Sequence, residues 1–167
     1  SASVTGKERD KTAMDIKREG IHFLKAPCHF YYPEFDNEDD FCDFLINELE
    51  EKIIEIGPEN IMAFIAEPIL ASGGVIVPPK NYNYRCWEVV KRYNIIYIAD
   101  EVVTAFGRLG YWFASEHVFG IIPDIIIFAK GITSGYIPMG GYAVSEKFMS
   151  TFSGDEADGC LYSNGYT

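Results

Sequence analysis

The sequence has little positive charge. Of its 167 residues, 14 are Lys or Arg and 25 are Asp or Glu, which gives a formal net charge of -11 at pH 7. Nucleic acids and anionic membranes are bound by clustered basic side chains, so this composition argues against both as partners. An acidic surface that keeps the protein in solution is the simpler explanation.

Paired cysteines and long apolar runs are also lacking. The cysteines are scattered, with no C-x-x-C pair and no His at metal-ligand spacing, so we expect free thiols and no metal site. No apolar run approaches the roughly 20 residues that span a bilayer, and no signal peptide opens the chain. We therefore expect a cytoplasmic protein without a membrane segment. The four cysteines are Cys28, Cys42, Cys86 and Cys160.

Phosphate-binding glycine motifs are missing as well. Neither G-x-G-x-x-G after a strand nor G-x-x-x-x-G-K-[ST] occurs, which disfavours a nucleotide-binding domain. We expect the glycine pairs at 73–74 and 140–141 to serve turns or close backbone approach. His22 and His29 lie in a proline-broken aromatic stretch, where hydrogen bonding or packing is a simpler role than metal ligation.

One amphipathic helix is evident near the start of the chain. Asp36 or Asn37 can cap it, and acidic residues fill its first turn. Apolar residues then recur every four positions until Gly57-Pro58, so one face is predicted to be buried. The recurring residues are Phe41, Leu45, Leu49 and Ile53.

Short β-rich runs alternate with helical segments in the rest of the chain. We predict strands at 61–66, 95–99, 124–129 and 141–145, a helix at 81–93 and a short helix up to His117. This alternation predicts one α/β domain with a mostly parallel sheet flanked by helices.

Two of these apolar runs end in a single charged residue. Asp100 follows IIYIA, and Lys130 follows DIIIFA. Ligands of open α/β sheets bind beyond the carboxyl ends of the strands, so both side chains are expected at one crevice. A cap for the next helix or an ion pair with Arg108 would also explain Asp100, and a side chain that reaches the surface would also explain Lys130. If Lys130 is instead buried, the neutral amine is favoured, which is the nucleophilic form.

The pair is more informative than either residue alone. An amine that can form a Schiff base and a carboxylate that can hold a pyridinium nitrogen are the protein groups that pyridoxal 5'-phosphate requires. The carboxylate keeps the ring able to accept electrons, while the amine tethers the aldehyde and moves protons. The sequence thus points to an enzyme with this cofactor.

Three segments carry a resemblance to a known family. They read AEPILASGGVIVPP at 66–79, IADEVVTAFGRLG at 98–110 and PDIIIFAKGITSGYIPMGG at 123–141. In order and spacing they resemble the signature of the class III aminotransferases, which are fold type I pyridoxal phosphate enzymes. The opening SASVTG and the later PCHFYYPEF most resemble the ω-amino acid or amine:pyruvate transaminase branch.

The resemblance implies a set of site residues. Lys130 would form the Schiff base with the cofactor, Asp100 would pair with its ring nitrogen, and Val102 would pack on the ring face. Glu67 would be an acid close to the site, with a structural role as the alternative. Thr167 would reach the cofactor phosphate of the neighbouring subunit in a homodimer with shared active sites.

Some positions depart from the family pattern. Val103 stands where many members have a Gln, and it can only pack there. Ser72 replaces a Glu of the ornithine and 4-aminobutyrate branches, so we expect ornithine and 4-aminobutyrate less than other amino donors. Ala105 replaces a common Gly. Asn164-Gly165 stands where His-Gly is usual before Thr167.

The resemblance covers only the middle of the family's large domain. Residues 1–167 are expected to be a partial cofactor-binding domain without the upstream phosphate turn and the C-terminal small domain. The implied activity is transfer of an amino group from an amine or ω-amino acid to an α-keto acid such as pyruvate, incomplete in this chain alone. An aminomutase, a decarboxylase, an epimerase and a non-catalytic remnant are the alternatives.

Overall fold

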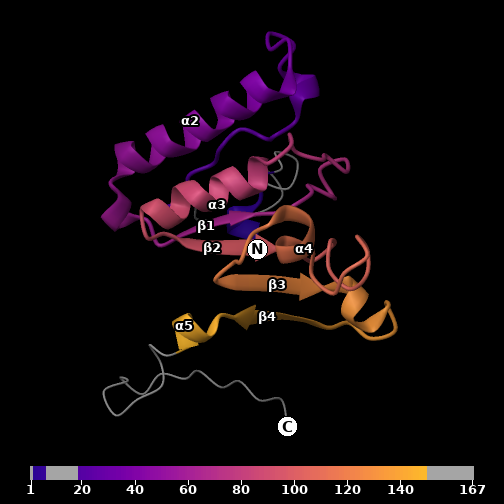
Figure 1. The fold of residues 1–167 in the computed structure, drawn as a ribbon. Helices are drawn as coiled ribbons and strands as arrows, with labels where there is room; N and C mark the ends of the chain where they lie inside the picture. Colours follow the sequence, from indigo (N-terminus) through magenta and orange to yellow (C-terminus); the bar gives the residue numbers. More distant parts are fainter. Residues whose placement is uncertain (1, 7–18, 150–167) are drawn as a thin grey trace, which may run out of the picture.

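The computed structural model describes residues 2–6 and 19–149. They form an α/β fold with one sheet in the order β1-β2-β3-β4 (Figure 1). The strands are β1 (Ala63–Ala66), β2 (Ile96–Asp100), β3 (Ile125–Ala129) and β4 (Gly140–Val144). The α-helices are α2 (Glu38–Ile56), α3 (Tyr82–Arg92), α4 (Ala114–Phe119) and α5 (Glu146–Met149). Short 3-10 turns are η1 (Ala2–Val4), η2 (His29–Tyr31), η3 (Pro58–Asn60) and η4 (Lys130–Thr133).

The sheet is parallel except at one edge. β1 pairs with β2, and β2 with β3, in parallel register, whereas β4 runs antiparallel to β3. The connection between β3 and β4 is only residues 130–139, and a crossover to a parallel neighbour needs about a dozen residues or more. The chain therefore turns back along β3. The predicted mostly parallel α/β sheet flanked by helices is confirmed.

Helix α2 forms where the four-residue apolar repeat predicted it. The Asn37 side chain accepts the backbone N–H of Asp40 at 2.9 Å and so caps the first turn. Gly57 ends the helix at a φ of 87°, a value that favours glycine. All four predicted core residues are buried, together with Cys42 and Ile46.

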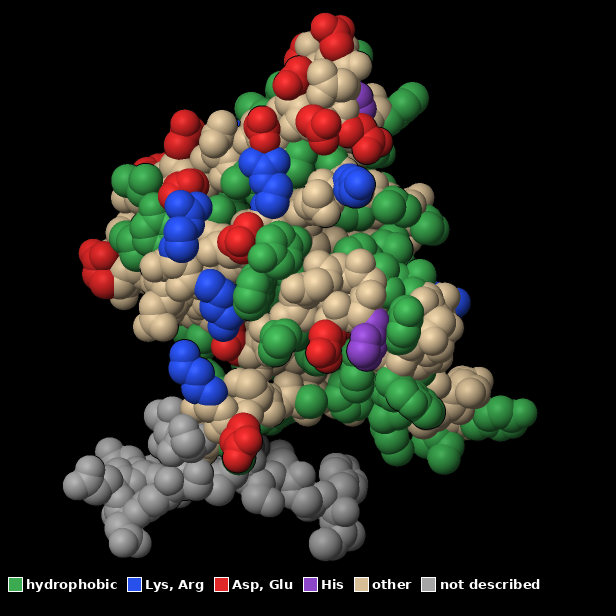
Figure 2. Space-filling model, in the orientation of Figure 1, with side chains coloured by type: hydrophobic (Ala, Val, Ile, Leu, Met, Phe, Trp, Pro, Cys, Tyr) green, Lys and Arg blue, Asp and Glu red, His purple; other side chains and the backbone are tan. Residues whose placement is uncertain are grey.

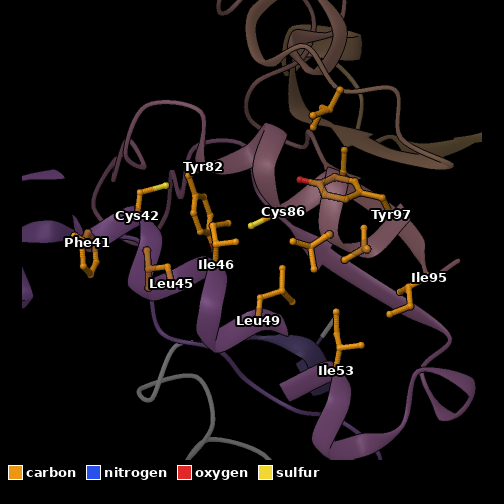
Figure 3. Packing of buried hydrophobic residues seen from close by; sticks show 14 residues of the cluster. Phe41, Cys42, Leu45, Ile46, Leu49, Ile53, Tyr82, Cys86, Ile95 and Tyr97 are labelled. Atoms are coloured by element: carbon orange, nitrogen blue, oxygen red, sulfur yellow. The ribbon is translucent and has the colours of Figure 1, made fainter. Parts of the chain in front are cut away.

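The core lies between α2, α3 and one face of the sheet. Leu45, Leu49 and Ile53 of α2 point toward the side chains of α3 and β2 (Figure 3). On β2, Tyr97 and Ala99 are buried in this core, while the alternate residues Ile96, Ile98 and Asp100 are half-buried. Because successive side chains of a strand point to opposite faces, Asp100 points away from the helices α2 and α3.

Several minor expectations are also settled. His29 Nε2 lies 2.9 Å from the carbonyl oxygen of Phe35, and its ring stacks on Phe41, so its role is hydrogen bonding and packing. A Cβ on Gly141 would lie 3.0 Å from the Phe128 ring, which confirms close approach at that pair. Cys28, Cys42 and Cys86 are free thiols. Within the described ranges no helix has both the length and the apolar character that membrane crossing requires.

Candidate active site

The carboxyl ends of three neighbouring strands bring three of the expected site residues to one edge of the sheet. Ala66 pairs with Ala99 and Asp100 pairs with Ile127, so Glu67, which follows Ala66, lies beside Asp100. Lys130 comes three residues after Ile127, which places it roughly 10 Å further along the strand direction. The parallel register therefore brings Glu67, Asp100 and Lys130 to the same edge. What each does toward a cofactor stays a prediction.

Asp100 is the last residue of β2, and its carboxylate is half-buried. Oδ1 accepts the backbone N–H of Val102 at 3.1 Å and so fixes the turn that follows the strand. Among residues 2–6 and 19–149, neither Arg108 nor another basic side chain forms an ion pair with Asp100, and Oδ2 accepts no hydrogen bond. One carboxylate oxygen is thus available to a donor outside the described residues.

Lys130 begins η4, directly after β3. The interpretation that Lys130 is buried is wrong, because its side chain is exposed. The strand ends one residue earlier, and the chain turns out of the sheet with a φ of 48° at Lys130, in the left-handed region that costs non-glycine residues free energy. Within the described part of the chain the ammonium group has no ion pair. Lys130 is therefore exposed at the edge of the sheet where the parallel strands β2 and β3 end.

Val102 and Glu67 occupy the positions around this pair. Val102 is half-buried, two residues beyond the end of β2. Glu67 Oε2 accepts the backbone N–H of Ala71 at 3.2 Å, which supports a structural role in the turn after β1. Thr167 lies outside the described residues.

Glu101 is a residue that the sequence reasoning missed. Its carboxylate is fully buried and accepts the backbone N–H groups of Ala114 and Ser115, at 2.7 and 2.9 Å. It also accepts the hydroxyl groups of Thr104 and Ser115. Sequence reasoning offered Asp100 as a possible cap of the next helix, but the first turn of α4 is capped by Glu101. The sequence held one indication of this: Phe113 at the N-cap position has no side-chain acceptor, so the cap of α4 must come from another residue.

At the carboxyl ends of the strands, Lys130 is exposed in the described part of the chain. A cavity of about 670 Å³ lies elsewhere, lined by residues of α4 and β4, and neither Asp100 nor Lys130 lines it. Exposed apolar side chains gather instead over the connection between η4 and β4, where Tyr136 is 91% and Ile137 59% exposed (Figure 2). The surface next to Lys130 is therefore one that further protein can cover.

The side chains present fit the cofactor that the sequence suggested. Pyridoxal phosphate requires an accessible amine and a carboxylate with a free oxygen, and Lys130 and Asp100 supply these from neighbouring parallel strands. Gly131 lets η4 approach closely, since a Cβ there would lie 3.0 Å from Phe106 Cβ in the loop after Asp100. Asp100 and Lys130 thus lie next to segments that pack against each other.

A parallel sheet with this lysine and carboxylate at adjacent strand ends is the arrangement of a fold type I pyridoxal phosphate enzyme. The family model described as aminotransferase class III matches residues 1–165. The chain belongs to the class III aminotransferase family, and the resemblance found in the sequence is confirmed.

Curated relatives support membership of this family. The chain is 47% identical over 153 residues to the putrescine–pyruvate aminotransferase of Pseudomonas aeruginosa, covering 89% of this chain and 33% of that protein. It is 38% identical over 169 residues to the mitochondrial gamma-aminobutyrate transaminase 1 of Oryza sativa subsp. indica, covering 100% of this chain and 32% of that protein. The chain thus spans about a third of the length of these curated relatives.

Solved structures show the same fold. An (S)-enantioselective omega-transaminase from Thermomicrobium roseum superposes with a TM-score of 0.88 at 40% identity, covering 99% of this chain and 36% of that one. The omega transaminase of Pseudomonas jessenii, in complex with PMP, gives a TM-score of 0.84 at 39% identity, covering 90% and 33%. The described sheet and helices are therefore those of the transaminase fold.

Proposed function

We propose that this chain carries the reactive residues of a pyridoxal-phosphate-dependent aminotransferase that moves an amino group from an amine or ω-amino acid to an α-keto acid such as pyruvate. The observation that carries the proposal is the placement of Asp100 and Lys130. Both follow neighbouring parallel strands, and neither forms an ion pair with the described residues. Membership of the aminotransferase family supports the same reading.

Each residue has a role that its position supports. When bound, pyridoxal phosphate supplies an electron sink for the electrons left on the substrate carbon when that carbon loses a proton. Lys130 Nζ would bind the cofactor aldehyde, give it up to the substrate amine, and then carry the proton away from the substrate carbon. Asp100 Oδ2 would hold the ring N–H, and Val102 would pack on the ring face. Glu67 would stand nearby.

The substrates are proposed from the relatives. The names of these relatives include putrescine and gamma-aminobutyrate, which point to donors with a terminal primary amine, and pyruvate, which points to a keto acid acceptor. The expectation that 4-aminobutyrate is a less favoured substrate, because Ser72 stands where that branch has a Glu, stays a prediction. A homodimer with shared active sites, to which Thr167 would contribute, is also part of the proposal. Exposed Tyr136 and Ile137 beside η4 support a covered interface there.

The proposal is tested by adding pyridoxal phosphate to the chain and recording its visible absorbance. Lys130→Ala should abolish the protein-bound band, whereas Lys80→Ala, which removes another exposed lysine, should leave it unchanged. A band that survives Lys130→Ala would show that other lysines react and would contradict the proposal.

Product analysis separates the alternatives. With putrescine and pyruvate, an aminotransferase forms alanine. With an amino acid as substrate, a decarboxylase releases carbon dioxide from its carboxylate, and an aminomutase returns an isomer of its amino substrate. A remnant would give no product and no band that depends on Lys130. We expect the isolated chain to bind cofactor weakly and to turn over poorly, because the phosphate-binding turn that supplies much of the hold lies outside it in the family pattern. Tight stoichiometric binding by this chain would contradict that expectation.

A further inference from the structure

Glu101 is a buried carboxylate whose hydrogen-bond partners are all neutral. Oε1 accepts from the backbone N–H and hydroxyl of Ser115, and Oε2 from the hydroxyl of Thr104 and the backbone N–H of Ala114. No basic side chain among the described residues pairs with it. Burying an ionised carboxylate is costly, and here donors from two segments offset the cost.

These bonds close the loop of residues 102–113 on itself. The loop begins at the end of β2 and finishes at the first turn of α4, and Glu101 binds both ends. The Glu101 backbone adds two further bonds, donating to the Ile127 carbonyl on β3 at 2.8 Å and accepting the N–H of Ala105 at 3.1 Å. One residue therefore joins β2, β3, the loop and α4.

The same loop contacts both reactive segments. At its start, Val102 donates to Asp100 Oδ1. In its middle, Ala105 and Phe106 lie against Gly131, the residue after Lys130, so closely that a Cβ on Gly131 would be 3.0 Å from Phe106 Cβ. The loop thus contacts both the segment of Asp100 and that of Lys130.

We propose that Glu101 is a positioning residue that sets the separation of Asp100 and Lys130 by holding the loop of residues 102–113 in place. The inference rests on the proposed function for its catalytic meaning, although the geometry stands without it. Glu101 touches neither cofactor nor substrate. It acts through the loop, whose two contacts fix the carboxylate on one side and η4 on the other.

Glu101→Gln is a sharp test because it keeps the side-chain shape. The hydroxyl groups of Thr104 and Ser115 can rotate to accept from the new NH2 group, but the N–H of Ala114 or of Ser115 must then face another donor. Glu116→Gln is the matched control, since Glu116 is exposed in the first turn of α4 and makes the same change of charge.

The first measurement needs no cofactor. In Glu101→Gln, amide hydrogen exchange should rise about tenfold or more in residues 102–113 and also in 130–135, with α2 unchanged. Glu116→Gln should change neither segment. If exchange at 130–135 stays as in the unsubstituted protein, or rises equally throughout the fold including α2, the inference is overturned.

The second measurement uses bound pyridoxal phosphate at saturation. The band that depends on Lys130 should still form in Glu101→Gln, but its circular dichroism should weaken, and the single-turnover rate with amine should fall by about 10²-fold, the loss expected from a misplacement near 1 Å. An unchanged spectrum and rate would overturn the inference. If even the unsubstituted protein lacks a band that depends on Lys130, the proposed function and the catalytic role of Glu101 both fail. The exchange data still decide whether Glu101 holds the two segments.

A second variant covers the case in which Glu101→Gln does not fold. Thr104→Val removes only one donor from Oε2 and keeps the size of the side chain. It should raise exchange in both segments and weaken the circular dichroism in the same direction, by less. No change in either measurement would overturn the inference.

Discussion

Two regions that meet at β2, the face covered by α2 and α3 and the carboxyl edge of the sheet, differ in how far their side chains are buried and paired. Toward α2 and α3, Tyr97 and Ala99 are fully buried among apolar side chains. Toward the carboxyl edge, Asp100 is half-buried without an ion pair among the described residues, and Lys130 is exposed. The helix-covered face is stabilised by contacts among the described residues, whereas the carboxyl edge leaves Asp100 and Lys130 without an ion pair among them.

The largest effect is expected in the helix-covered face. Leu45→Ala removes a side chain that is 2% exposed and should lower the free energy of unfolding by about 2–5 kcal/mol, through lost burial and the cavity left behind. Ile54→Ala on the same helix, at 63% exposed, should change it by less than about 0.5 kcal/mol. Urea unfolding measures both. Equal losses would show that α2 does not cover a self-sufficient core.

The carboxyl edge should show the opposite pattern. Asp100→Asn should lower the rate of transamination by about 10²–10³-fold, the loss typical of one preorganised electrostatic group, with little change in unfolding free energy. The reason is that its side chain makes a single hydrogen bond to the described residues. Steady-state kinetics and urea unfolding of the same variant test this. A large loss of stability with normal kinetics would assign Asp100 to the scaffold.

Alkaline pH should weaken the helix-covered face. Burial raises the pKa of the Cys86 thiol from 9.0 to about 12, and burial also raises the pKa of Tyr82. When a group has a higher pKa in the folded state than in the unfolded state, its contribution to the free energy of unfolding is fully present below the unfolded-state pKa. That contribution is lost as the pH rises toward the folded-state pKa. Between pH 9 and about 12, unfolding free energy should therefore fall, by about 1.4 kcal/mol per pH unit for Cys86 alone. Cys86→Ala should reduce the slope of unfolding free energy against pH. An unchanged slope would show that the Cys86 thiol does not cause the loss of stability.

The smallest effect is expected at the start of α2. Asn37→Ala removes the acceptor of the Asp40 N–H and should cost about 1 kcal/mol. Asn47→Ala, an exposed site inside the same helix, should stabilise slightly because alanine has the higher helix propensity. Thermal unfolding of the two variants gives shifts of opposite sign if the cap is correctly assigned.

Local sequence patterns predicted what local forces determine. The four-residue repeat from Phe41 to Ile53 gave α2, and the apolar runs before Asp100 and Lys130 gave two adjacent strands. These signals follow from burial and backbone geometry within one segment.

Tertiary contacts determined the rest. The exposure of Lys130 depends on where η4 leaves the sheet, and the sequence pattern carried no sign of that exit. Glu101 was missed because its partners are 13 and 14 residues away, on α4. Neighbouring acidic residues look alike in sequence, but Asp100 at the end of β2 is half-buried, whereas Glu101 directly after it is fully buried.

The backbone of Lys130 has a consequence for how the chain could change under selection. Its φ of 48° lies where a non-glycine residue costs roughly 1–2 kcal/mol, so Lys130→Gly should make the protein more stable while removing the amine. Selection for folding alone would favour glycine at this position. A chain no longer selected for catalysis would gain stability from that exchange.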